Sequence, residues 1–232
     1  MNFEIIAETF PDYLRGALVT VVLLLGSLII GLFLSFVVAT MRLSKKRWLS
    51  LPAWSFIYFF RGTPLLVQMY MIYYGLPQFS LFRETFLWTF FQLPSFCALL
   101  ALSLNNAGYT AAIIFNGVKA TDKGEVEAGR AYGMKTWQLM RFIILPSAIR
   151  RSIPAYSNEI IFMLHATALV SLITIADITG VARKIYTRFY TPFEAFIIAA
   201  LFYLALTILI TALARKIEKK LTVFRGKDYS LQ

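Results

Sequence analysis

The chain has 232 residues, of which 59% are hydrophobic and 15% are charged, and its mean hydropathy is +0.67. Soluble globular domains contain about 45 to 50% apolar residues, so this composition excludes an ordinary soluble domain and indicates an integral membrane protein. The formal net charge is +11, but the cations flank apolar stretches instead of forming one compact basic face, which argues against nucleic-acid binding.

Five apolar stretches reach the roughly 20 residues that a helix needs to cross the hydrocarbon core of a bilayer. The stretches are continuous, and continuous apolar runs favour helices over the alternating strands of a barrel. In chain order they are residues 17–40, about 51–76, 95–118, 154–175 and 193–213. The sequence therefore predicts an all-α integral membrane protein with five transmembrane helices, organised as one domain over residues 1–232.

The distribution of Lys and Arg predicts the orientation, because cationic short loops resist translocation. With the N-terminus outside, most cations lie on the cytoplasmic side, in residues 42–47, 119–151 and 215–227. The outer side then has a smaller set: Arg15, Arg83, Arg183, Lys184 and Arg188. We therefore expect an N-out, C-in topology.

The second predicted span contains Arg61-Gly62-Thr63-Pro64. Proline removes a helix hydrogen bond and disfavours helical geometry at the residue before it, so we expect a kink or break near Thr63. The alternative is that spanning begins at Pro64 and that the preceding residues are interfacial. Residues 77–94, which follow, are rich in Phe but interrupted by polar residues, which predicts an outer interfacial segment instead of a sixth span.

A polar, glycine-punctuated insert lies between the third and fourth spans, within residues 119–152. The pattern predicts a helix over about 124–132, a stop at Gly133, and a second helix through Trp137 and Met140. The small residues Ala128, Gly129 and Gly133 would let another surface approach the backbone closely, and a short helix in a partner's groove is a recurrent binding mode. The alternative is an ordinary loop packed on its own bundle.

The insert, with Glu127-Ala128, Gly133 and Ile144-Leu145-Pro146, resembles the cytoplasmic loop of permease subunits of binding-protein-dependent ABC importers. Further segments strengthen the resemblance: residues 60–68 (FRGTPLLVQ), 105–111 (NNAGYTA) and 154–161 (PAYSNEII). Together they resemble the polar amino-acid permeases, closest to those for histidine, lysine, arginine, ornithine and octopine-type opines. The chain departs from many relatives at Ala112, where they have Glu, and at His165, where they have Lys.

The resemblance implies the fold of the smaller, type I ABC importer permease and a location in the bacterial inner membrane. The implied partners are an ABC ATPase dimer, a homologous or identical second permease, an external substrate-binding protein and membrane lipid, with no nucleic acid. The implied substrates are basic amino acids, with neutral polar amino acids or opines as the alternative. The implied ATPase-coupling residues are Glu127, Ala128, Gly129, Tyr132 and Gly133.

Glu159 is the leading candidate for contact with substrate. A carboxylate near the centre of a span costs about 2.5 to 3.5 kcal/mol on insertion scales, so such residues usually face the bundle interior or a wet pathway. A basic substrate could compensate its charge, and the alternative is an ion pair with Arg61 or shallow burial near the cytoplasmic end. Helical geometry puts Glu159, Met163 and Ala166 on one stripe and Asn158, Phe162 and His165 on the next.

Four further residues complete the predicted substrate pathway: Gln68, His165, Asn158 and Thr167. Gln68 could contact a ligand or join helices by hydrogen bonds, with the second role favoured. A protonated His165 would repel a cationic substrate, so a structural role is favoured for it.

Catalysis by this chain is not expected. The sequence has no Gly-x-Ser-x-Gly motif, no His-Glu-x-x-His metal motif and no Gly-x-x-x-x-Gly-Lys-Ser/Thr phosphate loop. We therefore expect no catalytic residue, metal or cofactor in the chain itself, and ATP and Mg²⁺ bound by a separate ATPase. A stand-alone channel or carrier and a membrane-embedded enzyme are the competing classes, distinguished by ATP-independent uptake and by substrate conversion.

Overall fold

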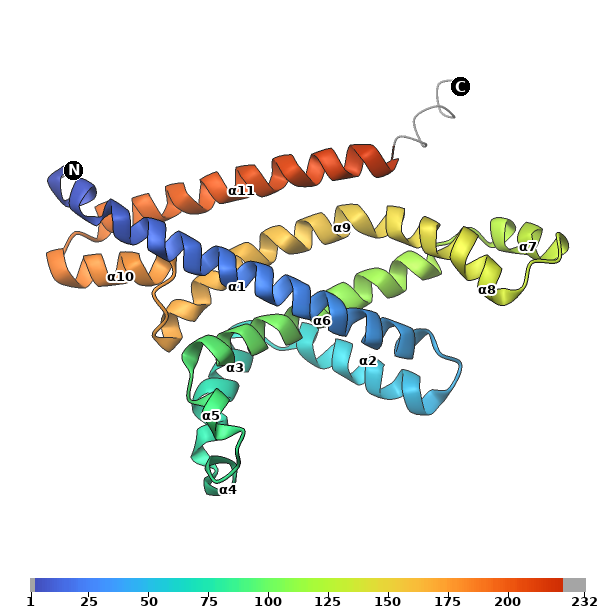
Figure 1. The fold of residues 1–232 in the computed structure, drawn as a ribbon, viewed down its shortest axis with the longest axis horizontal. Helices are drawn as coiled ribbons and strands as arrows, with labels where there is room; N and C mark the ends of the chain where they lie inside the picture. The colour runs from blue at the N-terminus through green and yellow to red at the C-terminus, as the bar shows by residue number, and fades with distance from the viewer. Residues whose placement is uncertain (1–2, 223–232) are drawn as a thin grey trace.

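The computed structural model describes residues 3–222, with side chains described over residues 6–220; Arg225 and Lys227, counted above among the cations, lie outside these ranges. All regular secondary structure in residues 3–222 is helical. Four long helices form the body of the molecule (Figure 1): α1 (Phe3–Leu43), α6 (Pro94–Lys119), α9 (Leu145–Ala166) and α11 (Pro192–Thr222).

Shorter helices connect the long ones. Between α1 and α6 lie α2 (Arg47–Gly62), α3 (Leu65–Tyr70), the π-helix η1 (Met71–Gly75), the 3₁₀ helix η2 (Leu76–Gln78), α4 (Ser80–Arg83) and α5 (Trp88–Phe91). Between α6 and α9 lie α7 (Lys123–Ala131), α8 (Thr136–Leu139) and the π-helix η3 (Met140–Ile144). Between α9 and α11 lie the 3₁₀ helix η4 (Thr167–Ile173) and α10 (Ile178–Phe189).

Four of the five predicted spans are stretches of helix long and apolar enough to cross a membrane: Ile6–Leu43, Pro94–Lys119, Thr136–Ile173 and Pro192–Lys220. The second predicted span, residues 51–76, is instead divided into α2 and α3 with η1. The fourth also differs, because its helical stretch begins well before residue 154 and runs through Pro154. A proline is tolerated inside a membrane helix where neighbouring groups satisfy the freed backbone.

The core is built on close contact between α1 and α6, the most extensive helix pair of the bundle. At Gly31 on α1, an added Cβ would collide with the Asn106 side chain on α6, so the glycine permits this approach. Small residues let membrane helices pack backbone to backbone in this way. A second apolar cluster joins α1, α10 and α11, where the Tyr13 hydroxyl donates to the Ala195 carbonyl at 2.7 Å.

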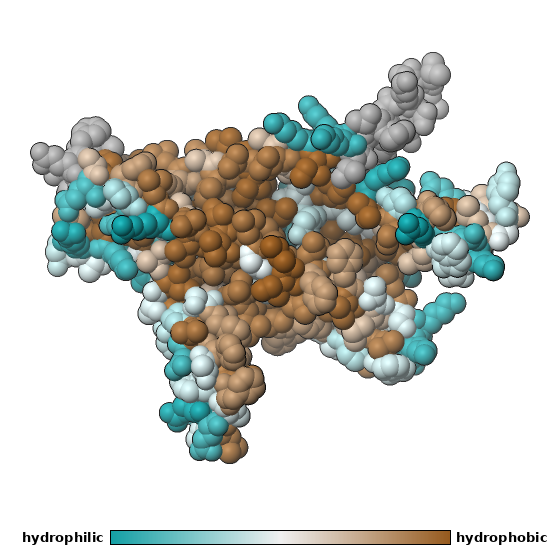
Figure 2. Space-filling view, viewed as in Figure 1, coloured by the Kyte–Doolittle hydropathy of each residue, from teal (hydrophilic) through white to brown (hydrophobic). Residues whose placement is uncertain are grey.

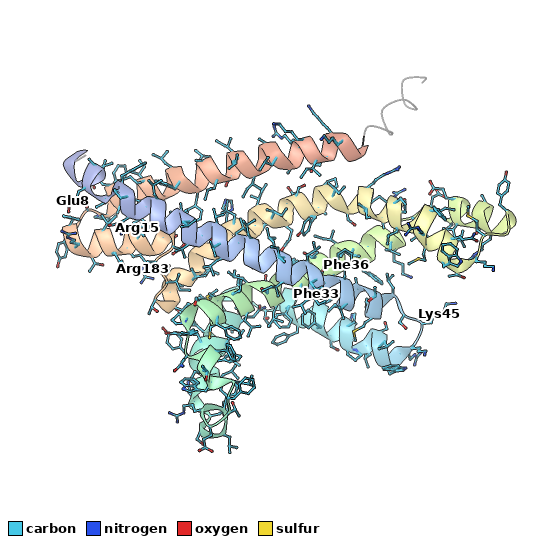
Figure 3. All side chains as sticks on the ribbon, in the orientation of Figure 1. Glu8, Arg15, Phe33, Phe36, Lys45 and Arg183 are labelled. Atoms are coloured by element: carbon cyan, nitrogen blue, oxygen red, sulfur yellow. The ribbon has the colours of Figure 1, made fainter. Side chains whose placement is uncertain are left out.

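A broad apolar surface covers the outside of the bundle (Figure 2). Phe33 and Phe36, for example, project from α1 with 71% and 52% of their surface exposed (Figure 3). A soluble monomer rarely exposes contiguous apolar area on this scale. The exposed surface is therefore the one that meets lipid or other membrane helices.

The aromatic segment 77–94 forms a short hairpin of α4 and α5 that projects from the side of the bundle (Figure 1). Edge-to-face contacts hold it together, with the Phe82 and Phe91 ring centroids 5.0 Å apart and those of Phe91 and Phe96 5.2 Å apart. Helices of four residues are too short to cross a bilayer. The prediction that this segment is not a sixth span is confirmed.

Candidate functional site: a cavity at a broken helix, and a polar insert

The predicted break in the second span is present. α2 ends at Gly62, and Thr63 and Pro64 both adopt extended backbone, with φ and ψ of −109° and 142° at Thr63 and −62° and 134° at Pro64. Pro64 supplies no N–H, and the residue before a proline prefers this extended region. The break therefore follows directly from the local sequence.

A hydrogen-bonded clamp satisfies the backbone that the break exposes. The side-chain amide nitrogen of Gln68 lies 3.0 Å from the carbonyl oxygens of Phe60 and Thr63 and 2.7 Å from the Thr63 hydroxyl, so its two N–H groups are shared among three acceptors. From α6, the Asn105 amide donates to the Phe60 carbonyl at 3.1 Å and to the Gln68 side-chain oxygen at 3.2 Å. Irregular backbone at membrane depth requires such partners.

A cavity of about 560 Å³ opens beside the break. Residues 61–65 form one wall, and α6 contributes Asn105 and Tyr109. α9 and its extension contribute a further part of the lining, with Glu159, Phe162, Met163, Ala166 and Leu169. Glu159, Met163 and Ala166, predicted to share a stripe, thus face one cavity together.

Opposite charges line this cavity from different helices. Glu159 is 7% exposed, whereas Arg61 is exposed at the end of α2. The Arg61 guanidinium lies over the Tyr109 ring, 5.3 Å from its centroid, and the Tyr109 hydroxyl donates to the Arg61 carbonyl at 3.4 Å. Neither Arg61 nor Glu159 takes part in an ion pair among the described side chains, so both charges face the cavity without a protein counter-ion in contact.

The other predicted substrate-pathway residues lie elsewhere. Gln68 is buried in the clamp. His165 is exposed on the side of α9 that faces α11, with its Nε2 3.2 Å from the Thr207 hydroxyl. Thr167 is fully buried and donates to the Leu164 carbonyl at 2.6 Å, and Asn158 is exposed outside the cavity lining. Of the five predicted residues, the cavity includes Glu159.

Sequence reasoning left Arg61 and Tyr109 out of the candidate site. From the sequence alone, Arg61 is considered only as an ion-pair partner for Glu159, and Tyr109 only as part of the segment 105–111. A signal was nevertheless present, because an arginine within an apolar stretch and next to a helix break is a functional candidate in its own right.

The polar insert has the predicted helix-turn-helix form. The Asp122 carboxylate caps α7 by accepting from the Gly124 amide at 2.6 Å. α7 ends before Gly133, which has φ of +78°, a left-handed conformation that glycine adopts without strain. α8 then continues through η3 into α9 as a single helical stretch, so the insert and the cavity wall are parts of one rod.

The predicted coupling residues divide into two faces. Glu127, Ala128, Tyr132 and Gly133 are exposed, and Tyr132 is 89% exposed. Gly129 is buried against the following helices, so an added Cβ would meet Leu139 at 2.6 Å and Ile143 at 2.7 Å. The close approach expected at Gly129 is therefore an internal one, between α7 and the following helices. The insert itself lies at one end of the molecule (Figure 1).

Comparison with known proteins identifies the family. Residues 27–223 match the family described as "Binding-protein-dependent transport system inner membrane component". The chain is 44% identical over 219 residues to the nopaline transport system permease protein NocM of Agrobacterium fabrum, covering 94% of this chain and 91% of that protein. It is 43% identical over 206 residues to the histidine/lysine/arginine/ornithine transport system permease protein HisM of Escherichia coli strain K12, covering 88% and 87%.

Solved structures agree on the fold. A crystal structure described as an amino acid ABC transporter with histidines superposes with a TM-score of 0.86 at 34% identity, covering 95% of this chain and 99% of that one. An inward-facing conformation of the MetNI methionine ABC transporter superposes with a TM-score of 0.67 at 18% identity, covering 94% and 96%. The second likeness concerns the fold alone.

Proposed function

The chain belongs to the family of binding-protein-dependent transport system inner membrane components, and we propose that it is the permease subunit of an ATP-driven importer of basic amino acids. Members of this family are transport permeases of the inner membrane and are not themselves catalytic. The observation that carries the proposal is that Arg61 and Glu159, from different helices, line one cavity. The name of the HisM relative supports the same substrate class.

The two charges complement the two ends of a basic amino acid. Arginine offers two parallel N–H donors to a carboxylate, so Arg61 suits the α-carboxylate of the substrate. Glu159 suits the cationic side chain, and a bound cation would offset the cost of its burial. The Tyr109 ring under Arg61 holds the guanidinium in place.

An opine importer is the second candidate, favoured by the similarity to NocM. Opines carry additional carboxylate, and a cavity of about 560 Å³ has room for a larger ligand than a single amino acid. A neutral polar amino acid is the third possibility, and it would make no charge-assisted bond with Glu159.

The insert is the proposed docking site for the ATPase. The chain has no phosphate loop, so ATP and Mg²⁺ belong to a separate ATPase dimer, and no cofactor is assigned to this chain. Glu127, Ala128, Tyr132 and Gly133 present an exposed, compact surface to such a partner. We place this surface in the cytoplasm because of the cations around it, which gives the N-out, C-in orientation.

The continuous helical stretch Thr136–Ile173 supports a mechanism of coupling. Closure of the ATPases on ATP would displace the insert, and the rod from α8 to η4 would carry that displacement to Glu159 and the cavity wall. A second permease would complete the pathway, and an external binding protein would deliver substrate to the outward-facing cavity. Hydrolysis would restore the inward-facing state.

The test is uptake by proteoliposomes that contain the chain with its ATPase, second permease and binding protein. Glu159→Gln should weaken arginine and lysine uptake by about tenfold or more, since a hydrogen bond to a charged group contributes about 1.5 to 3 kcal/mol. Uptake of any neutral amino acid should change little. Arg61→Gln should weaken uptake of basic and neutral amino acids alike, because every amino acid has an α-carboxylate.

Glu84→Gln on the exposed hairpin is the matched control and should leave uptake unchanged. If the complex that contains Glu159→Gln assembles normally and transports arginine with unaltered kinetics, Glu159 is structural and does not recognise the basic side chain of the substrate. If the complex transports an opine in preference to arginine, the second candidate replaces the first.

A further inference from the structure

A cationic pocket lies at the end of the bundle opposite the insert. It has a volume of about 410 Å³, and its polar lining comprises Ser171, Thr174, Arg183, Lys184, Thr187 and Arg188. The last four belong to α10, where spacings of one, four and five residues put them on one side of the helix. The other side of α10 is buried, with Ile178, Val181, Ala182 and Ile185 in the core.

The positive charge of this pocket is only partly balanced. Arg188 pairs with Glu8 of α1 at 3.4 Å, and Arg15 lies 4.0 Å from Asp12, both pairs being well exposed. Among the described side chains, Arg183 and Lys184 have no ion pair; Arg183 reaches the Ser171 carbonyl at 3.5 Å. Figure 3 shows Arg15, Arg183 and Glu8 together at this end of the molecule.

The carboxylate nearest in sequence, Asp177, does not neutralise these cations. It is fully buried, one oxygen accepts from the Gly180 amide at 2.8 Å, and the other accepts from the Tyr203 hydroxyl at 2.9 Å. Glu194, in the first turn of α11, is already engaged in an interaction and is not among the residues that line the pocket. The pocket therefore keeps a net positive charge.

The end of the molecule that carries α10 is polar, and it adjoins the broad apolar surface of the bundle (Figure 2). Exposed aromatic residues accompany it, with Tyr186 43%, Tyr190 83% and Phe193 68% exposed. Tyr and Trp concentrate at the headgroup level of membranes, and an amphipathic helix with cations on its polar face is typical of the same level. α10 has both features.

We propose that this pocket binds the phosphodiester headgroup of an anionic phospholipid. Two arginines and a lysine supply charge-assisted hydrogen bonds to phosphate oxygens, and the Thr187 and Thr174 hydroxyls add neutral donors. α10 packs against α1 and α11, whose exposed apolar side chains, such as Leu14 and Phe193, offer a surface for the acyl chains. This continuity with the lipid-facing surface favours a lipid over a soluble acidic protein as the occupant.

The experiment measures lipid binding to the full-length chain, purified with its ATPase in a neutral detergent. Dioctanoyl phosphatidylglycerol, dioctanoyl phosphatidylcholine and inorganic phosphate are titrated separately, and bound lipids are counted by native mass spectrometry. Phosphatidylglycerol should bind more tightly than phosphatidylcholine. The variant Arg183→Gln/Lys184→Gln/Arg188→Gln should bind it about a hundredfold more weakly, at about fivefold for each cation.

The matched control is Lys45→Gln/Lys46→Gln/Arg47→Gln, which removes the same charge from the exposed connection between α1 and α2 and should leave lipid binding unchanged. Arg183→Gln alone, with an expected loss of about fivefold, serves if the triple variant does not fold. Equal binding of phosphatidylglycerol by the wild type and either variant overturns the proposal. If inorganic phosphate binds as tightly as phosphatidylglycerol, the pocket is a general anion site, and that result also overturns the proposal. If a variant keeps lipid binding but loses the uptake that depends on the binding protein, the pocket is a protein-docking surface and the lipid proposal is overturned.

Discussion

The Asn105 side-chain amide on α6 donates to the Gln68 side-chain oxygen on α3 at 3.2 Å, across the break in the second span. Through this bond the two side chains act as one clamp on the freed carbonyl groups of Phe60 and Thr63. The clamp holds the wall of the cavity that presents Arg61.

Gln68→Leu should therefore destabilise the protein. It keeps the side-chain volume but leaves the Thr63 carbonyl without its side-chain donor and the Asn105 amide without the Gln68 acceptor. Asn105 still donates to the Phe60 carbonyl. Each polar group left unsatisfied costs about 1 to 3 kcal/mol. For a chain of this size, each kcal/mol lowers Tm by roughly 2 to 4 °C. Thermal unfolding of the purified complex measures the effect. Gln92→Leu, at an exposed glutamine, is the control, and an equal change in both variants would exclude the clamp.

Gly31→Val should disrupt the packing of α1 against α6. The new side chain would collide with Asn106, which is fully buried and has little room to move. Overpacking of this kind costs about 1 to 3 kcal/mol. The measurement is the yield and Tm of folded protein. Gly62→Ala, where an added Cβ meets open space, should leave the Tm unchanged, and a normal Tm for Gly31→Val would show that the helices separate without cost.

Gly129→Val should separate α7 from α8 and weaken coupling to the ATPase while the bundle stays folded. The added side chain would meet Leu139 and Ile143, so the insert must open to admit it. We expect the ATPase to lose the stimulation of ATP hydrolysis that the loaded binding protein causes. The Tm should change little, because the insert is peripheral to both core clusters. Glu125→Val, at an exposed residue of α7 outside the proposed docking surface, keeps the internal contact and is the control. If the complex that contains Gly129→Val hydrolyses ATP and transports substrate normally, the packing of α7 against α8 is not what couples the subunits.

Asp177→Asn should change how stability depends on pH. Burial raises the pKa of Asp177, and the hydrogen bonds from Gly180 and Tyr203 offset this only in part. Between the ordinary carboxyl pKa of about 4 and the higher value in the folded state, the folded protein binds more protons than the unfolded chain. In that window the free energy of unfolding of the wild type therefore falls as the pH rises.

The side-chain amide introduced by Asp177→Asn cannot titrate, so the variant lacks this slope while it keeps a side-chain oxygen to accept from Gly180. The measurement is the Tm of wild type and variant over a series of acidic to neutral pH values. Asp12→Asn, at an exposed carboxylate, should follow the wild type. Parallel curves for the wild type and Asp177→Asn would contradict the prediction.

Local sequence determined much of this protein. The apolar runs predicted the membrane class and four complete spans, Pro64 predicted the break before it, and Gly133 predicted the stop between the two insert helices. These features depend on neighbours in the chain, namely on apolar length and on the backbone preferences of proline and glycine. Helical spacing likewise predicted that Glu159 and Met163 share one face.

Only the tertiary structure decided which polar side chains reach the cavity. Gln68 turns into the clamp because Asn105, 37 residues away, completes it, and His165 meets Thr207 because α11 packs beside α9. Arg61 faces the same cavity as Glu159 although almost a hundred residues separate them. Helical periodicity assigns a residue to a face of its own helix, but the neighbour of that face depends on long-range packing, which no local pattern contains.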